Sequence, residues 1–159
     1  PQIMKAVNQV NIKQKKYFLN KITKRFKEKK IKNYIFAIWG VSYKPDTDDI
    51  RESISISIIE EIVKLKGIVR IYDPKSLNNA KQYFKDNKRV LFCESKYEVT
   101  KDADALILLT EWPEFRSPEF DKLKSYLKTP VIFDGKNQYD KYELKKRGFE
   151  YYQIGVKSL

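Results

Sequence analysis

IFAIWGVSYKPDTDDIRES, residues 35–53, contains the pattern that decides the fold of this chain. Its first five residues form an unbroken apolar run, which is short enough to predict a single buried strand. A polar loop follows from Gly40 onward, and apolar residues then recur with helical spacing over residues 54–65. A buried strand that leads through a loop into a helix is the first half of a βαβ unit. In open α/β sheets ligands bind beyond the carboxyl ends of the strands, so we expect a ligand at this loop.

The remainder of the chain repeats this alternation. Short apolar runs predict further strands at residues 68–72, 89–93, 105–109, 130–133 and 149–154. Helical spacing predicts helices at residues 54–65, 78–86, 96–101, 118–127 and 142–146. The alternation predicts an α/β fold, a Rossmann-like, doubly wound parallel sheet of about six strands, over residues 31–159. We expect Gly67 and Gly148 to end the helices that precede them.

Residues 1–30 predict a separate long helix before this body. Apolar residues recur there at spacings of three, four or their sums, which places them on one stripe: Ile3, Val7, Val10, Phe18, Ile22 and Phe26. An isolated helix of this kind is marginally stable in water, so the stripe must pack on the body or on a second copy of the chain.

The loop after the first strand carries two cations, Lys44 and Arg51, close to the expected start of a helix. Helix N-termini and basic side chains both favour phosphate, so the loop predicts a phosphate-bearing ligand. Gly40 lacks the further glycines of the G-x-G-x-x-G pattern, so ordinary NAD binding by this loop is not expected. In the structural alternative, Lys44 and Arg51 only form ion pairs with the loop aspartates, and Tyr43 is a packed loop aromatic.

Lys136 lies on a second loop that we expect at the same edge of the sheet, after the fifth strand. The preceding Gly135 permits a close approach or a positive φ, and Lys136 offers a cation to phosphate. The alternative for Lys136 is an ordinary surface lysine. After the fourth strand, we expect Trp112 to be buried with its indole N–H hydrogen-bonded, which is a structural role.

Three separated motifs carry a resemblance to a known family. They are GVSYKPDTDDIRES at residues 40–53, LLTEWPEF at residues 108–115 and FDGKN at residues 133–137. In this order and spacing they resemble the C-terminal UDP-binding domain of the nucleotide-sugar dehydrogenases. Within that family they are more similar to the UDP-glucose 6-dehydrogenases than to members that act on amino-sugar or GDP-sugar substrates. The resemblance covers nearly the whole chain.

The resemblance implies roles for four residues. Tyr43 and Lys44 match positions that contact the UDP-sugar, and Arg51 matches a position that reaches NAD, which the family holds mainly on an N-terminal domain. Lys136 matches a substrate-binding position that is usually arginine in the family, and lysine keeps the charge without the bidentate fork. The implied reaction converts UDP-glucose to UDP-glucuronate and reduces two NAD.

The resemblance also implies what this chain lacks. The catalytic cysteine and lysine of the family belong to motifs that are not present in this sequence, so we expect no catalytic residue here and no turnover by this chain alone. The abrupt start without methionine likewise suggests a piece of a longer protein. The long helix of the family forms the core of its dimer interface, which implies a homodimer through residues 1–30.

Composition narrows the remaining possibilities. The net charge of +12 comes mostly from residues 1–33, which hold eleven Lys or Arg and one acid. We read this as a solvated helix face rather than a nucleic-acid arm, since no aromatic-interleaved or glycine-arginine pattern accompanies it. There is no histidine, and we expect no metal site. The single cysteine, Cys93, has no neighbouring base, so we expect an unreactive thiol in or near the core. One cysteine cannot form an internal disulfide, which indicates a reducing, cytoplasmic location. No apolar run approaches the length of a membrane span.

Three alternatives to the UDP-glucose assignment stay open. The first is the same domain of another nucleotide-sugar dehydrogenase, such as one acting on UDP-N-acetylmannosamine. The second is a basic nucleic-acid-binding module that uses the lysine-rich helix. The third is an interaction fragment that dimerises and binds no nucleotide.

Overall fold

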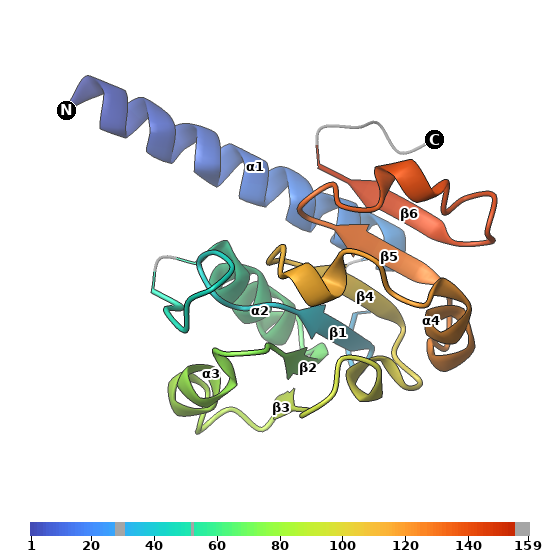
Figure 1. The fold of residues 1–159 in the computed structure, drawn as a ribbon. Helices are drawn as coiled ribbons and strands as arrows, with labels where there is room; N and C mark the ends of the chain where they lie inside the picture. The colour runs from blue at the N-terminus through green and yellow to red at the C-terminus, as the bar shows by residue number, and fades with distance from the viewer. Residues whose placement is uncertain (28–30, 52, 155–159) are drawn as a thin grey trace.

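A six-stranded sheet forms the centre of the protein (Figure 1). The computed structural model describes residues 1–27, 31–51 and 53–154, except for the side chains of residues 7, 8 and 10. The strands are β1 (Ile35–Trp39), β2 (Ile68–Tyr72), β3 (Val90–Phe92), β4 (Ala105–Leu108), β5 (Val131–Asp134) and β6 (Glu150–Gln153). They lie in the order β3-β2-β1-β4-β5-β6, and every neighbouring pair is parallel. The strand order reverses between β1 and β4, which confirms the prediction of a doubly wound, Rossmann-like α/β sheet.

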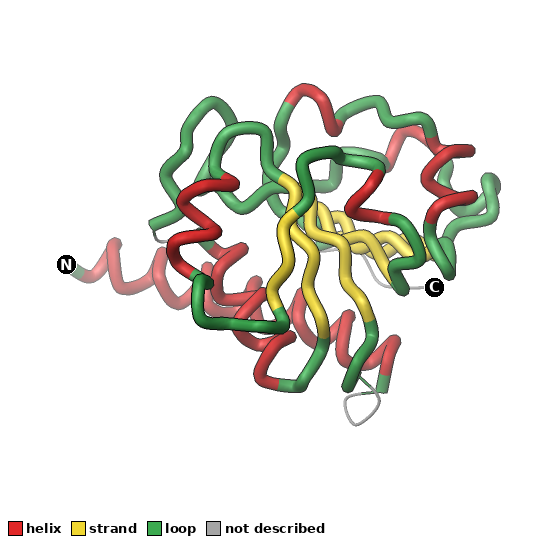
Figure 2. The backbone as a smooth tube through the Cα atoms, turned by 90° about the horizontal axis from the view of Figure 1, so that it is seen from below, coloured by secondary structure: helices red, strands yellow, loops and turns green. Residues whose placement is uncertain are grey.

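Helices cover both faces of the sheet (Figure 2). One face carries α1 (Gln2–Phe26), α2 (Ile54–Lys64) and α3 (Leu77–Tyr83). The other carries α4 (Phe120–Tyr126) and the 3-10 helices η2 (Glu98–Thr100), η3 (Pro113–Phe115) and η4 (Asp140–Tyr142). Of the helix predicted over residues 96–101, only the 3-10 turn η2 forms.

Strand β1 shows how the sheet separates two cores. Phe36 and Ile38 point into the core beneath α1, α2 and α3, whereas Ala37 and Trp39 point into the core beneath α4. All four side chains are fully buried. Because both faces are covered, the strand reads as a continuous apolar run instead of an alternating one, and this is why its bounds could be predicted from the sequence.

The C-terminal half of α1 is part of the first core. Phe18, Ile22 and Phe26 from the predicted stripe are buried there, and the ring of Phe18 lies edge-on to that of Phe133 on β5. The N-terminal half projects away from the body, and Ile3 is 81% exposed (Figure 1). The predicted stripe thus packs on the body over its second half. The positions 7 and 10 of the stripe lie outside the described side chains, as do the expected last residues of the helix, 28–30.

Helix α1 runs antiparallel to β6. Arg25 forms a bidentate ion pair with Glu150 at the start of β6, and the ammonium of Lys21 donates to the carbonyl of Gln153 at its end. Lys21 is 9% exposed, so this cation belongs to the packed body and not to a free basic face.

Two helix ends differ from the predictions. Lys66, with a φ of 66°, takes the left-handed position after α2 that was predicted for Gly67. The amide of Lys66 donates to Val63 and that of Gly67 to Ile62, which together form a Schellman motif. Gly67 is needed for space, because a Cβ there would lie 2.7 Å from Cγ2 of Ile62.

The helix predicted over residues 142–146 does not form. Glu143 adopts a left-handed conformation with a φ of 51°, and this ends η4 after a single turn. Residues 144–148 continue as turns up to Gly148, which has a φ of 88°. At the start of α2, Ile54 is 43% exposed, although the periodicity placed it on the buried face.

None of the helices in the described part of the chain has both the length and the apolar character needed to cross a membrane. Within the same residues, no group of three or more His, Cys, Asp and Glu side chains is arranged to hold a metal ion.

Candidate nucleotide site

Three loops meet at the carboxyl edge of the sheet. The signature loop, residues 40–53, follows β1 and ends at Ser53, whose hydroxyl accepts from the amide of Ser55 and caps α2. Residues 109–112 follow β4, and residues 135–139 follow β5. The parallel topology therefore brings Lys44 and Lys136 to the same edge, on loops separated by the loop after β4.

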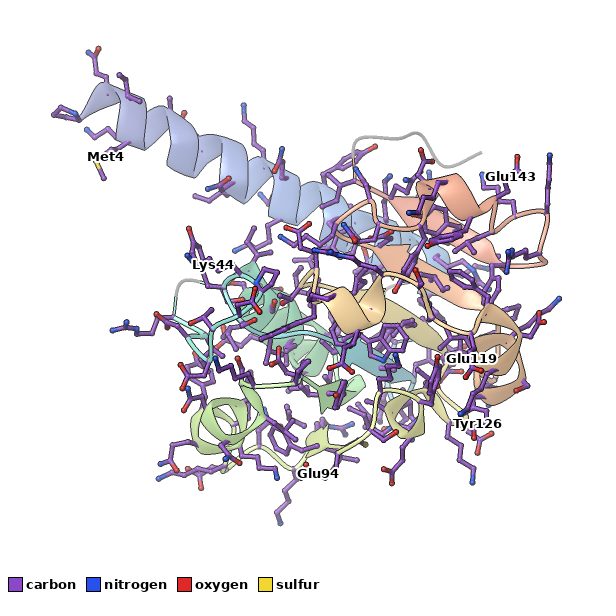
Figure 3. All side chains as sticks on the ribbon, in the orientation of Figure 1. Met4, Lys44, Glu94, Glu119, Tyr126 and Glu143 are labelled. Carbon is purple, nitrogen blue, oxygen red and sulfur yellow. The ribbon has the colours of Figure 1, made fainter. Side chains whose placement is uncertain are left out.

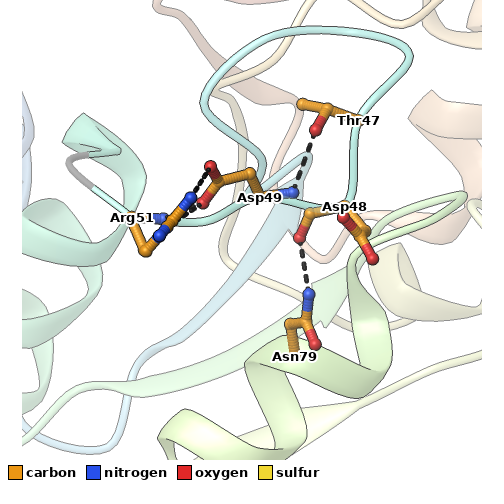
Figure 4. Close-up of polar contacts among 5 residues, drawn as sticks. All are labelled: Thr47, Asp48, Asp49, Arg51 and Asn79. Carbon is orange, nitrogen blue, oxygen red and sulfur yellow. Dashed lines mark hydrogen bonds and ion pairs between the residues drawn. The ribbon is translucent and has the colours of Figure 1, made fainter.

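The signature loop is folded by its own polar groups and by α3 (Figure 4). The amide of Tyr43 donates to the carbonyl of Asp49 at 2.8 Å and closes the loop at its base. The amide of Asp49 donates to the hydroxyl of Thr47, and Asn79 on α3 donates to the carbonyl of Asp48 at 2.8 Å. These bonds satisfy the backbone of the loop without using the side chains of Tyr43 and Lys44.

Tyr43 and Lys44 are presented to solvent. Tyr43 is 59% exposed, which does not fit the alternative that it is a packed loop aromatic. Lys44 is exposed as well and lies at the periphery of the molecule (Figure 3). The hydroxyl of Ser42 donates to the carbonyl of Lys44 at 2.8 Å, so the backbone that carries these two side chains is held in place.

Arg51 forms a bidentate ion pair with Asp49 (Figure 4). Its Nε and Nη2 atoms lie 3.0 and 2.9 Å from the two carboxylate oxygens. The side-chain and backbone hydrogen bonds from Arg51 lower the pKa of Asp49 to about 2. The ion pair expected in the structural alternative is therefore formed by Arg51.

The turn after β1 packs against the loop after β4, beside the crevice where dinucleotides bind in related folds. Gly40 has a φ of 91°, and a Cβ at this position would lie 2.4 Å from Cβ of Thr110. The Thr110 hydroxyl donates to the carbonyl of Ser42 at 3.0 Å and holds the two loops together. The turn thus has neither the glycine pattern of dinucleotide-binding folds nor free space beside the Cα atom of Gly40.

Asp134 shapes the loop that carries Lys136. Its fully buried carboxylate accepts from the amides of Lys136 and Tyr139, both at 2.9 Å, and from the hydroxyl of Tyr151 at 2.6 Å. Burial raises the pKa of Asp134, although these hydrogen bonds oppose the rise. Lys136 itself is exposed.

Gly135 is required for close approach and not for a positive φ. A Cβ there would lie 2.8 Å from the carbonyl oxygen of Leu108 and 3.5 Å from the ring of Phe18. The loop that carries Lys136 thus touches both the end of β4 and helix α1.

A hollow of about 580 Å³ lies between the signature loop and α3. Its lining includes Asp49, Arg51 and Asn79, but not Tyr43, Lys44 or Lys136. Tyr43, Lys44 and Lys136, the three predicted substrate residues, therefore lie at one edge of the sheet but do not share this hollow. Their roles, and that of Arg51, are proposals.

Sequence reasoning missed two buried aspartates, Asp73 and Asp134. Each follows or ends an apolar strand, and in such a place an aspartate is typical of a turn in which its carboxylate accepts backbone N–H groups. Asp73, after β2, also accepts from the indole N–H of Trp112 at 3.3 Å. Trp112 is 7% exposed, which confirms its predicted structural role.

Cys93 is partly buried against the core beneath α4, as predicted for a near-core thiol. Burial raises its pKa, so the thiol is kept in its protonated, unreactive form.

Residues 37–141 match the model of the UDP-glucose/GDP-mannose dehydrogenase family, UDP binding domain. The chain belongs to this family. The match covers the signature loop, the loop after β4 and the loop of Lys136, which are the three motifs that carried the resemblance.

Similar members of the family are named UDP-glucose 6-dehydrogenase. The one from Rhizobium meliloti is 41% identical over 75% of this chain and 26% of its own length. The one from Pseudomonas aeruginosa is 32% identical over 97% of this chain and 34% of its own length. The chain thus spans about a quarter to a third of the length of these relatives.

Solved structures of the family share the fold. A UDP-glucose dehydrogenase from the archaeon Pyrobaculum islandicum superposes with a TM-score of 0.76 at 22% identity, over 96% of this chain and 32% of that one. A UDP-D-ManNAc dehydrogenase from Pyrococcus horikoshii gives a TM-score of 0.74 at 25% identity, over 92% of this chain and 32% of that one.

Proposed function

We propose that this chain is the UDP-binding part of a UDP-glucose 6-dehydrogenase. The observation that carries the proposal is the presentation of Tyr43 and Lys44 by a fixed backbone, at the same sheet edge as Lys136, in a UDP-binding domain. The names of the relatives at 41% and 32% identity support UDP-glucose as the sugar nucleotide. The intact protein would oxidise C6 of the glucose to a carboxylate.

In this proposal each residue has a defined task. The ammonium groups of Lys44 and Lys136 bind the diphosphate through charge-assisted hydrogen bonds. The exposed ring of Tyr43 packs on the nucleotide and covers it from water. These contacts orient the UDP and leave the sugar to be placed by residues outside this chain.

NAD fits this chain only in part. Thr110 packs against the turn after β1, and this turn lacks the glycine pattern of an ordinary dinucleotide site. The guanidinium of Arg51 is exposed and pairs with Asp49 through Nε and Nη2, and a guanidinium has N–H groups beyond those of this pair with which to bind a cofactor phosphate. Two NAD molecules, bound mainly by another domain, would each accept one hydride from the sugar, and water would supply the second oxygen of the carboxylate. The free thiol of Cys93 favours a reducing compartment, and we place the protein in the cytoplasm.

The test of the proposed function is calorimetric titration of this chain with UDP. We expect saturable binding of UDP, because Lys44 and Lys136 offer two cations to its diphosphate. Absence of UDP binding would contradict the proposal and favour the interaction fragment.

The same preparation should not reduce NAD with UDP-glucose, as followed by absorbance of NADH. The reason is that the catalytic cysteine and lysine of the family are not in this sequence. Measurable turnover would overturn the assignment of the chemistry to another part of the protein.

A second candidate is the same domain of a UDP-N-acetylmannosamine dehydrogenase. The structural likeness to the Pyrococcus horikoshii protein favours it. Competition among UDP-sugars on the intact protein distinguishes the two, because the acetamido group would be recognised outside this chain. The nucleic-acid module is less favoured, since Lys21 and Arg25 of the basic helix are bound to the body.

The proposal includes a homodimer through α1. Ile3, Met4 and Ile12 on this helix are 81, 74 and 56% exposed. A cavity of about 360 Å³ between α1 and α2, lined in part by Ile12, Leu19 and Ile62, offers an apolar surface beside them. A second copy would cover these groups.

Sedimentation equilibrium should therefore show a dimer that Ile12→Glu weakens by at least about tenfold, because a carboxylate would be buried at the interface. Gln14→Glu is the matched control: it introduces a carboxylate on the same exposed helix, outside the cavity lining. A monomeric wild type, or equal effects of both variants, would contradict this interface.

A further inference from the structure

Asp73 is the most heavily hydrogen-bonded side chain at the candidate site, and it is buried. It follows β2 directly and is 3% exposed. Its Oδ1 atom accepts from the amides of Lys75 and Ser76 at 2.9 and 2.7 Å. Its Oδ2 atom accepts from the amide of Val41 at 2.8 Å, with a longer contact to the amide of Ser42 at 3.4 Å.

The donors to Asp73 come from three loops. Lys75 and Ser76 belong to the turn after β2, and Val41 and Ser42 open the signature loop after β1. The third loop, after β4, contributes the indole N–H of Trp112. A single carboxylate therefore ties together the ends of β2, β1 and β4, which are adjacent in the sheet.

The chain of contacts continues from Asp73 to the proposed ligand-binding residues. Ser42, held at its amide by Asp73, donates from its hydroxyl to the carbonyl of Lys44. The carbonyl of Ser42 in turn accepts from the hydroxyl of Thr110. Ser42 is 1% exposed and directly precedes Tyr43 and Lys44. The position of Ser42 therefore determines the backbone positions from which the two exposed side chains extend.

Only a carboxylate satisfies this set of donors. It is an acceptor at both oxygens and offers about four lone-pair sites, whereas an amide of the same shape has one acceptor oxygen and two N–H donors. In an asparagine, the amide nitrogen would face N–H groups from either the turn after β2 or the signature loop. A buried N–H group that loses its acceptor destabilises the folded protein, so one of the two loops would have to move.

We propose that Asp73 is a positioning residue for UDP: through Val41 and Ser42 it fixes the backbone from which Tyr43 and Lys44 reach the ligand. This inference rests on the proposed function, because it assigns Asp73 a task at the same site. Asp73 does not touch the nucleotide itself.

The test compares Asp73→Asn with Asp104→Asn in calorimetric titrations with UDP. Asp104 is a matched control: it is 8% exposed and accepts from the amide of Ile35 at 2.8 Å, but it lies before β4, at the opposite edge of the sheet. Both substitutions should lower the stability of the fold. Only Asp73→Asn should weaken UDP binding, by about tenfold, because it alone displaces the signature loop.

A double-mutant cycle separates positioning from a general structural role. If Asp73 acts through Lys44, then Asp73→Asn should weaken UDP binding much less in a Lys44→Ala background than in the wild type. Trp112→Phe removes one donor to Asp73 and keeps an aromatic ring, so it should weaken UDP binding by about threefold. This variant replaces Asp73→Asn in the test if Asp73→Asn does not fold.

The outcomes distinguish the two proposals. If the wild type binds UDP and folded Asp73→Asn binds it equally well, the positioning role is wrong while the proposed function stands. The role is also wrong if Asp104→Asn weakens binding as much as Asp73→Asn, or if the effects of Asp73→Asn and Lys44→Ala simply add. If Trp112→Phe has to carry the test, unchanged affinity overturns the role. A wild type that does not bind UDP overturns both.

Discussion

Replacement of Lys44 with alanine is expected to weaken UDP binding by about hundredfold, because a charge-assisted hydrogen bond from its ammonium to a phosphate is lost. The ammonium lies on an exposed part of the signature loop, whose backbone is held by Ser42 and by the bond between Tyr43 and Asp49. The substitution therefore removes a contact to the ligand without removing a contact of the fold. Calorimetry with UDP measures the affinity, and urea unfolding should show an unchanged stability.

Lys32→Ala is the control for this prediction. Lys32 is also exposed, but it lies in the turn before β1, at the amino edge of the sheet. Both variants reduce the net charge by the same amount, so any general attraction between the basic chain and the anionic ligand changes equally. An unchanged affinity in Lys44→Ala, or an equal loss in Lys32→Ala, would remove Lys44 from the site.

Replacement of Gly40 with alanine should lower the free energy of unfolding by roughly 3–4 kcal/mol, from positive-φ strain and from overpacking. The strain arises because Gly40 has a φ of 91°. The overpacking arises because the new Cβ would lie 2.4 Å from Cβ of Thr110, on a neighbouring loop with little room to move. Urea denaturation gives the difference directly.

Gly148→Ala isolates the contribution of the backbone angle. Gly148 has nearly the same φ, 88°, but its Cβ would meet the end of the flexible Lys124 side chain, at 2.4 Å from Nζ. That side chain can move away, so we expect a cost of about 1–2 kcal/mol, from the backbone angle alone. Equal losses in the two variants would show that contact with Thr110 does not constrain the turn.

The resemblance and the structure contribute differently to the assignment. The motifs lead to the family, and the match over residues 37–141 shows it. The structure adds that Thr110 packs against the turn at Gly40, which supports the proposal that a nucleotide is bound through side-chain cations at this edge instead of through the backbone of a glycine-rich turn.

Local sequence was sufficient to predict the strands of the sheet. The bounds of β1 were predicted correctly, because a strand buried on both faces is a continuous apolar run, and this run ends at Gly40. The bounds of β2 were also predicted correctly, although Arg70 interrupts its apolar residues, and this strand ends before Asp73. Parallel topology then required that the loops of Lys44 and Lys136 share an edge. Helix ends were less predictable, since Lys66 and Glu143 adopt left-handed conformations that their residue types do not favour.

The sequence by itself thus determined the α/β class, a doubly wound parallel sheet of about six strands, and the edge on which Tyr43, Lys44 and Lys136 lie. Only the tertiary structure decided that Arg51 pairs with Asp49, that Thr110 packs against the turn at Gly40, and that Asp73 ties three loops together. The physical reason is that apolar periodicity is a local property of the chain. A buried carboxylate, by contrast, selects its donors among groups that are distant in sequence and become neighbours only when the strands are assembled.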